Sequence, residues 1–76
     1  MTEPQKDTQR AIAAAKLIID GRDPKADHGA ILVTLEGLVS LILLTVMSEP
    51  RTAAAMLTEG LVPGVEARIA LAASRR

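Results

Sequence analysis

Apolar residues follow one another almost without interruption between Ala30 and Met47, and no other part of the chain shows this pattern. At about 100° per residue, the aliphatic side chains fill one broad arc of a helix, and several more lie on the opposite side. The polar or small exceptions in the stretch are Thr34, Glu36, Gly37, Ser40 and Thr45. A helix that is apolar nearly all round is enclosed by other helices or by lipid. The pattern therefore predicts a long hydrophobic central helix, which we place near 24–47.

The residues before this stretch predict an amphipathic helix near 4–20. Its apolar positions recur every three or four residues, Thr2 is suited to cap its start, and Gly21 is suited to end it. The segment that follows allows two starts for the central helix. Asp23 followed by Pro24 is a good cap with a first-turn proline, whereas Asp27 is an alternative cap closer to the apolar run. We favour a short turn of helix at Pro24 that runs into the central helix.

Two shorter helices are expected after the central one, near 50–59 and 63–74. Pro50 disfavours helical geometry at Glu49, so the axis must break there. Gly60 is suited to a left-handed cap, and Pro63 is suited to the first turn of a new helix. The sequence therefore predicts an all-α fold, a small four-helix bundle, with residues 1–76 forming one helical domain.

The balance of residues favours a folded chain of marginal stability. About half of the 76 residues are hydrophobic, a quarter are charged, and the formal net charge is zero. A chain of this length buries a small core, and the absence of cysteine excludes stabilisation by a disulfide. The central helix also has more apolar surface than three short amphipathic helices can cover. We therefore expect a homodimer or a larger helical assembly.

One face of the central helix is the predicted interface for this association. Its residues repeat at spacings of three and four and are Leu35, Leu38, Val39, Ile42 and Val46. Glu36 interrupts the apolar pattern, and a carboxylate in such a helix must be paired, exposed or protonated. An exposed or paired Glu36 is the simpler interpretation. The alternative is that Glu36 is a specificity residue of the interface, because a buried polar group can fix the register of packed helices.

Charge and composition exclude several classes of partner. Both halves of the chain are electrically neutral, so they lack the basic surface that drives nucleic-acid binding, and we expect no nucleic-acid partner. Aromatic residues are absent, and with them the platforms on which bases or sugars stack. The first residues have mixed charge and do not resemble a signal peptide, so a cytoplasmic location is expected.

Catalytic chemistry is not indicated. The chain has one histidine, no cysteine and no tyrosine, and it contains no glycine-rich phosphate loop. His28 lies near two aspartates, but a metal site needs a further well-placed ligand, so a role in capping the central helix is the better interpretation. We expect no catalytic residue, no cofactor and no metal, and hence no enzyme.

Two other interpretations stay open. Residues 30–47 are just long enough to span a bilayer, which would make the chain a membrane-associated small subunit. Residues 52–74 weakly resemble a helix-turn-helix of a DNA-binding regulator, although Glu66 near the start of its second helix would repel phosphate. We favour a soluble helical module that binds itself, and another protein, through helix faces. An inhibitor or a small assembly subunit would have these properties.

Overall fold

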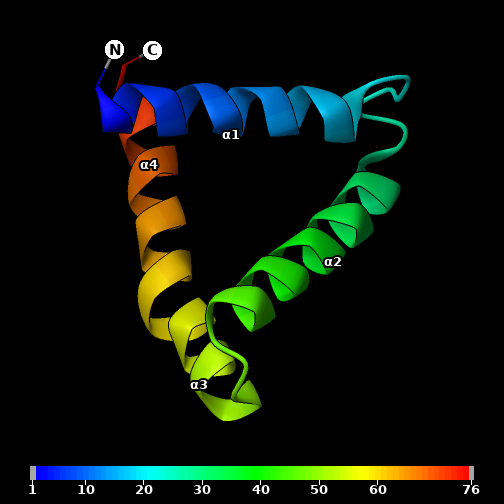
Figure 1. The fold of residues 1–76 in the computed structure, drawn as a ribbon. Coiled ribbons are helices and arrows are strands. Elements are labelled where there is room, and N and C mark those ends of the chain that lie inside the picture. The colour runs from blue at the N-terminus through cyan, green and yellow to red at the C-terminus, as the bar shows by residue number, and fades with distance from the viewer. Residues whose placement is uncertain (1, 76) are drawn as a thin grey trace. The chain divides into compact units, whose positions relative to one another are not determined.

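The computed structural model describes residues 2–75, and none of them lies in a strand. The helical segments are α1 (Glu3–Ile19), α2 (His28–Val46), α3 (Pro50–Ala55), the π-helical segment η1 (Met56–Leu61) and α4 (Val62–Ser74) (Figure 1). The chain divides into two compact units whose boundary falls between Leu38 and Val39, within α2. The expectation of an all-α protein is confirmed.

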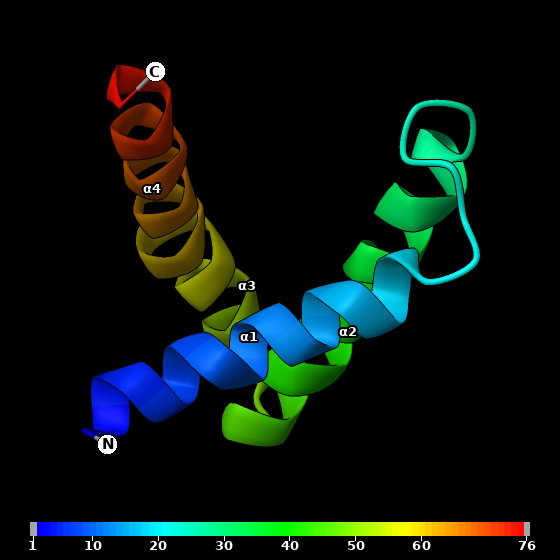
Figure 2. The same ribbon diagram turned by 90° about the horizontal axis from the view of Figure 1, so that it is seen from above.

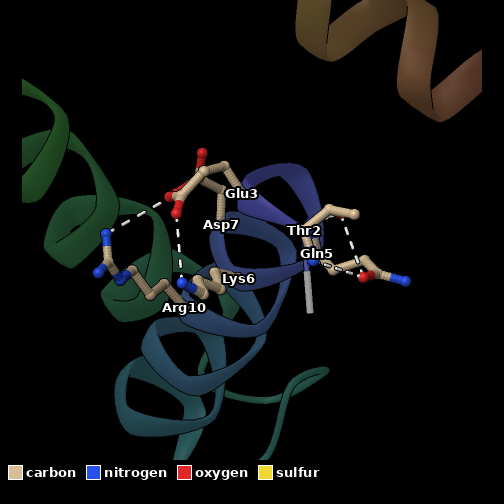
Figure 3. A network of polar contacts seen from close by, with 6 residues as sticks. All are labelled: Thr2, Glu3, Gln5, Lys6, Asp7 and Arg10. Atoms are coloured by element: carbon tan, nitrogen blue, oxygen red, sulfur yellow. Dashed lines mark hydrogen bonds and ion pairs between the residues drawn. The ribbon is translucent and has the colours of Figure 1, made fainter.

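Local side-chain chemistry sets the start of α1. The Gln5 backbone N–H donates to the Thr2 hydroxyl at 3.4 Å, and the Gln5 side-chain oxygen accepts from the Thr2 backbone N–H at 2.8 Å. This reciprocal pair is a capping box, and it satisfies two N–H groups that a helix start leaves without partners. Ion pairs of Lys6 with Glu3 at 3.2 Å and of Arg10 with Asp7 at 3.8 Å line the same two turns (Figure 3).

The connection from α1 to α2 is fixed by hydrogen bonds of its own side chains. Gly21 has φ +73°, the left-handed conformation that the expected helix end requires. The Asp23 carboxylate accepts from the Lys25 and Ala26 backbone N–H groups at 2.9 and 3.4 Å, so Asp23 caps a single turn. Within this unit, the Arg22 guanidinium donates to the Thr34 hydroxyl at 3.2 Å and holds the connection against the first half of α2.

The central helix starts at His28, four residues later than the start we favoured. The turn at Pro24 forms as expected but does not continue into α2. His28 Nδ1 lies 2.8 Å from the Lys25 carbonyl oxygen, and because a carbonyl only accepts, the imidazole is the donor. The Asp27 carbonyl accepts the Ile31 N–H at 3.0 Å and so begins the regular bonding of α2. The predicted range 24–47 is therefore corrected to His28–Val46.

The predicted break between α2 and α3 is confirmed, and Glu49 is the residue that makes it. Glu49 has extended backbone angles (φ −77°, ψ 115°), and Pro50 opens α3. The Glu49 carboxylate accepts from the Arg51 N–H at 3.1 Å and from the Thr52 N–H at 2.7 Å. The Thr52 hydroxyl donates to the same carboxylate at 2.6 Å. These bonds cap the helix that follows.

The predicted break at Gly60 is wrong, and so is the count of four helices. Residues 50–74 form one uninterrupted helical run, from α3 through η1 into α4, so residues 2–75 contain three helices (Figure 2). Gly60 does not have a positive φ. The Val62 N–H bonds to the carbonyl of Leu57, five residues back. This wider π turn makes room for the Pro63 ring, which would clash with the carbonyl four residues earlier in an α-helix.

Little apolar surface is buried within either unit. Among residues 2–75 only Ala53 is buried, with 5% of its surface exposed. The half-buried residues of the first unit lie at the end of α1, in the connection and on α2: Ile18, Arg22, Ile31, Thr34 and Leu38. In the second unit, Val39, Leu43, Ala55 and Met56 are half-buried. The packed core expected of a bundle is thus not present inside either unit.

Candidate interaction surface

The predicted interface residues lie together on one face of α2, and we call this set the seam: Leu35, Leu38, Val39, Ile42 and Val46. Leu38 and Val39 are half-buried, whereas Leu35, Ile42 and Val46 are 43%, 51% and 63% exposed. Aliphatic side chains in such numbers on one helix face are normally covered in a folded protein. Neither unit by itself covers the seam.

A further residue of this face was not assigned to the predicted interface. Leu32 lies three residues before Leu35 and seven before Val39, and it is 54% exposed. These spacings place Leu32 in line with the seam and extend it by one turn. The arc of aliphatic positions around Leu35 already indicated Leu32, so the signal was in the sequence.

The opposite side of α2 is apolar as well. Val33 and Leu41 are 66% and 68% exposed, the highest values on this helix among its large hydrophobic residues. Leu41 is about 160° around the helix from Val39, so one flat partner cannot cover both. The nearly all-round apolar character predicted from the sequence is therefore present on the molecular surface.

Threonine hydroxyls add little polarity to this surface, because they bond to the backbone of their own helix. The Thr34 hydroxyl donates to the Ala30 carbonyl at 3.0 Å, and the Thr45 hydroxyl donates to the Leu41 carbonyl at 2.7 Å. Such bonds satisfy a hydroxyl without water. Both threonines are consequently compatible with an apolar surrounding.

Glu36 is exposed and is the one carboxylate of α2. It lies beside the seam, one residue after Leu35, on a strip of the helix that also contains Gly29. An added Cβ at Gly29 or Gly37 would have open space around it, since no atom of the chain comes within 4 Å of that position. Neither glycine is therefore needed for packing within the described residues.

The histidine and the carboxylates of the described residues do not gather into a metal site. No set of three or more histidine and carboxylate side chains that could hold a metal ion occurs among residues 2–75. His28 instead bonds to the Lys25 carbonyl, in the hinge position expected for it. A shallow depression lined by Pro4, Gln5, Thr8 and Gln9 lies on α1 and contains no titratable side chain.

Glu49 is the group with the clearest electrostatic perturbation. The hydrogen bond from the Thr52 hydroxyl, followed by the backbone N–H bonds of Thr52 and Arg51, lowers the pKa of the Glu49 carboxyl below its usual value of 4.5. These bonds stabilise the ionised form. Because the carboxylate caps α3, the shift reflects a structural role.

The sequence left two alternatives open, a helix-turn-helix in residues 52–74 and a membrane span in residues 30–47. Residues 52–74 contain no turn between two helices, because α3, η1 and α4 are continuous, so the arrangement that a helix-turn-helix needs is absent there. By length and composition, α2 is long and apolar enough to cross a membrane. A core helix of a soluble assembly has the same two properties.

Comparisons of the chain with protein-family models, with curated proteins and with solved structures give no match.

Proposed function

We propose that the chain is a small non-enzymatic interaction module that self-associates through α2 and acts on another protein by covering part of its surface. The observation that carries this proposal is the exposure of the seam, where Leu35, Ile42 and Val46 remain accessible beside half-buried Leu38 and Val39. In this proposal the core of the helical bundle forms between copies. The two units then act as one cytoplasmic domain.

The exposed apolar residues outside α2 support a second protein partner. Leu17 on α1 is 79% exposed, and Ile69 and Leu71 on α4 are also exposed. These positions lie on elements other than α2 and are not part of the seam. An apolar helix or groove of another protein is the kind of surface that would cover them.

The test compares two substitutions on opposite sides of the same helix. Leu35→Lys places an unpaired charge in the seam, at a cost of about 3 kcal/mol or more, which weakens a dimer about a hundredfold. Val33→Lys is the matched control on the opposite side of α2, since Val33 is about 160° around the helix from Leu35 and is 66% exposed. We expect wild type and Val33→Lys to have dimer mass in light scattering at micromolar concentration, and Leu35→Lys to have monomer mass. A monomeric wild type contradicts the proposal.

A membrane-associated subunit is the second candidate, because α2 is long and apolar enough to form a span. Glu36 at its centre costs about 3 kcal/mol in lipid, and the chain has no tryptophan or tyrosine to mark the bilayer interfaces. Flotation with phosphatidylcholine vesicles separates the two candidates. Vesicle binding that Leu35→Lys and Val33→Lys weaken equally supports the span. Wild-type protein that stays dimeric without detergent and does not float with the vesicles supports the seam.

A further inference from the structure

We infer that η1 is a hinge and that α4 moves about it as a rigid arm. The hinge consists of the π turn at Met56–Leu61 and of Pro63, which follows it. It lies within one chain, so its motion does not depend on self-association. Three features of residues 50–74 support the hinge: the place where side-chain packing ends, the weak backbone bonding of η1 and the two ways in which a helix accommodates Pro63.

Side-chain packing of this helical run ends at Met56, the first residue of η1. Ala53 is buried, and Ala55 and Met56 are half-buried. From residue 57 to residue 75, every residue is exposed. The direction of α4 relative to α3 therefore depends on the backbone of η1 and hardly on packed side chains. Segments with few buried contacts open and move most easily.

The backbone of η1 is held less firmly than that of a regular α-helix. The Val62 N–H bonds to the carbonyl of Leu57, five residues back, in the wider geometry of a π turn. Pro63 has no N–H, so the next bond of the helix is missing. Gly60 adds backbone freedom because it lacks a Cβ, and the space around it is open. Bending at this point consequently meets little resistance.

A helix accommodates Pro63 in two ways. In the structure, the π turn makes room for the ring. In the alternative, the Val62 N–H bonds to the Thr58 carbonyl four residues back. The ring of Pro63 then clashes with the Glu59 carbonyl and kinks the axis by more than about 20°. Both arrangements keep the run helical, and they differ in one backbone hydrogen bond and in the direction of α4, which is how a hinge works.

Distances between two spin labels measure the spread of α4 directions. Ala54 and Ala70 are exposed and lie on either side of the hinge, and the chain contains no cysteine, so Ala54→Cys/Ala70→Cys takes two nitroxide labels. In a continuous α-helix, the two Cα atoms are about 24 Å apart. Electron paramagnetic resonance on frozen samples, diluted with unlabelled protein, gives the distance distribution within one chain.

Two adjacent substitutions in the labelled chain test the role of Pro63. Pro63→Ala removes the ring and supplies an N–H, so a single α-helical arrangement is expected. Gly64→Ala is the matched control, because an added Cβ has open space there and Pro63 stays in place. We expect the distance distributions of wild type and Gly64→Ala to be roughly twice as broad as that of Pro63→Ala.

The opposite results are equally clear. A wild-type distribution as narrow as that of Pro63→Ala would show that the π turn is rigid, and a distribution that stays broad in Pro63→Ala would place the motion elsewhere. Either result overturns the hinge. Hydrogen exchange completes the test, because an arm that turns without unfolding keeps the amides of residues 66–73 equally protected in wild type and both variants. Loss of this protection in wild type would show that α4 unfolds, which overturns the rigid arm.

Discussion

Glu49 shows how a single side chain can end one helix and begin another. Its carboxylate accepts three hydrogen bonds from Arg51 and Thr52, and its extended backbone separates α2 from α3. All three bonds favour the ionised carboxylate, and the bond from the Thr52 hydroxyl contributes most to lowering its pKa. The start of α3 therefore depends on pH through one exposed group.

This dependence gives a prediction with a definite sign. Because the pKa of Glu49 is lower in the folded chain, the stability it contributes is fully present above its ordinary value of 4.5 and is lost as the pH falls through the lower folded value. Wild type should lose helical signal in circular dichroism over this acidic range. Glu49→Gln should start with less helix at neutral pH and lose less on acidification. An identical acid profile for the two proteins would show that the cap contributes nothing.

Gly21 and Gly60 were expected to play the same role, and the structure separates them. Gly21 has φ +73°, where a side chain is strained, whereas Gly60 has no positive φ and open space around an added Cβ. Gly21→Ala should destabilise the chain by about 1 kcal/mol, and Gly60→Ala should stabilise it by about 0.5–1 kcal/mol. Urea unfolding measures both free energies. Destabilisation by Gly60→Ala would restore the helix break expected at that position.

At the scale of the element, the sequence predicted those helix ends that local chemistry determines. The Thr2 cap, the Gly21 end and the break at Glu49–Pro50 each depend on residues within four positions of one another. The end expected at Gly60 failed because a glycine and a following proline are compatible with two structures. In the first structure, the glycine ends one helix with a left-handed cap and the proline starts a new helix. In the second, a π turn accommodates Pro63 within a continuous helix. Local patterns do not decide between them.

The candidate surface was predictable in part for a related reason. Helical periodicity placed Leu35, Val39 and Ile42 on one face, and the structure places them on the same side of α2. Periodicity identifies a face by the difference in hydrophobicity between it and the rest of the helix. That difference is small in α2, where the apolar residues Val33 and Leu41 outside the seam are also exposed. The sequence therefore indicated an unusually apolar helix more strongly than it indicated which side is an interface.

At the scale of the whole molecule, the exposed apolar side chains explain why an assembly is expected. A chain of 76 residues buries a modest fraction of its surface, and here only Ala53 is buried among residues 2–75. Association covers apolar surface that neither unit covers by itself. It also makes stability depend on protein concentration, because the folded state and the assembly are then linked.

Glu36 tests whether the assembly depends on a polar residue. It is exposed and shares its strip with Gly29, so we expect it to remain in contact with solvent beside the seam. Glu36→Gln should then change stability by less than about 0.5 kcal/mol, and Glu36→Leu should be neutral or stabilising at unchanged dimer mass. If Glu36 were instead buried and paired in the interface, its removal would leave a partner charge unpaired, at a cost of about 3 kcal/mol or more.

The two outcomes differ widely in measurable terms. A loss of about 3 kcal/mol lowers the Tm of a domain of this size by more than about 10 °C, whereas a surface change moves it by a few degrees at most. Tm and solution mass of Glu36→Leu, Glu36→Gln and wild type are measured at one protein concentration, because an assembling protein melts higher when concentrated. A large fall in Tm together with a changed mass for Glu36→Leu would make Glu36 the residue that specifies the interface. An unchanged mass leaves specificity to the aliphatic side chains of the seam.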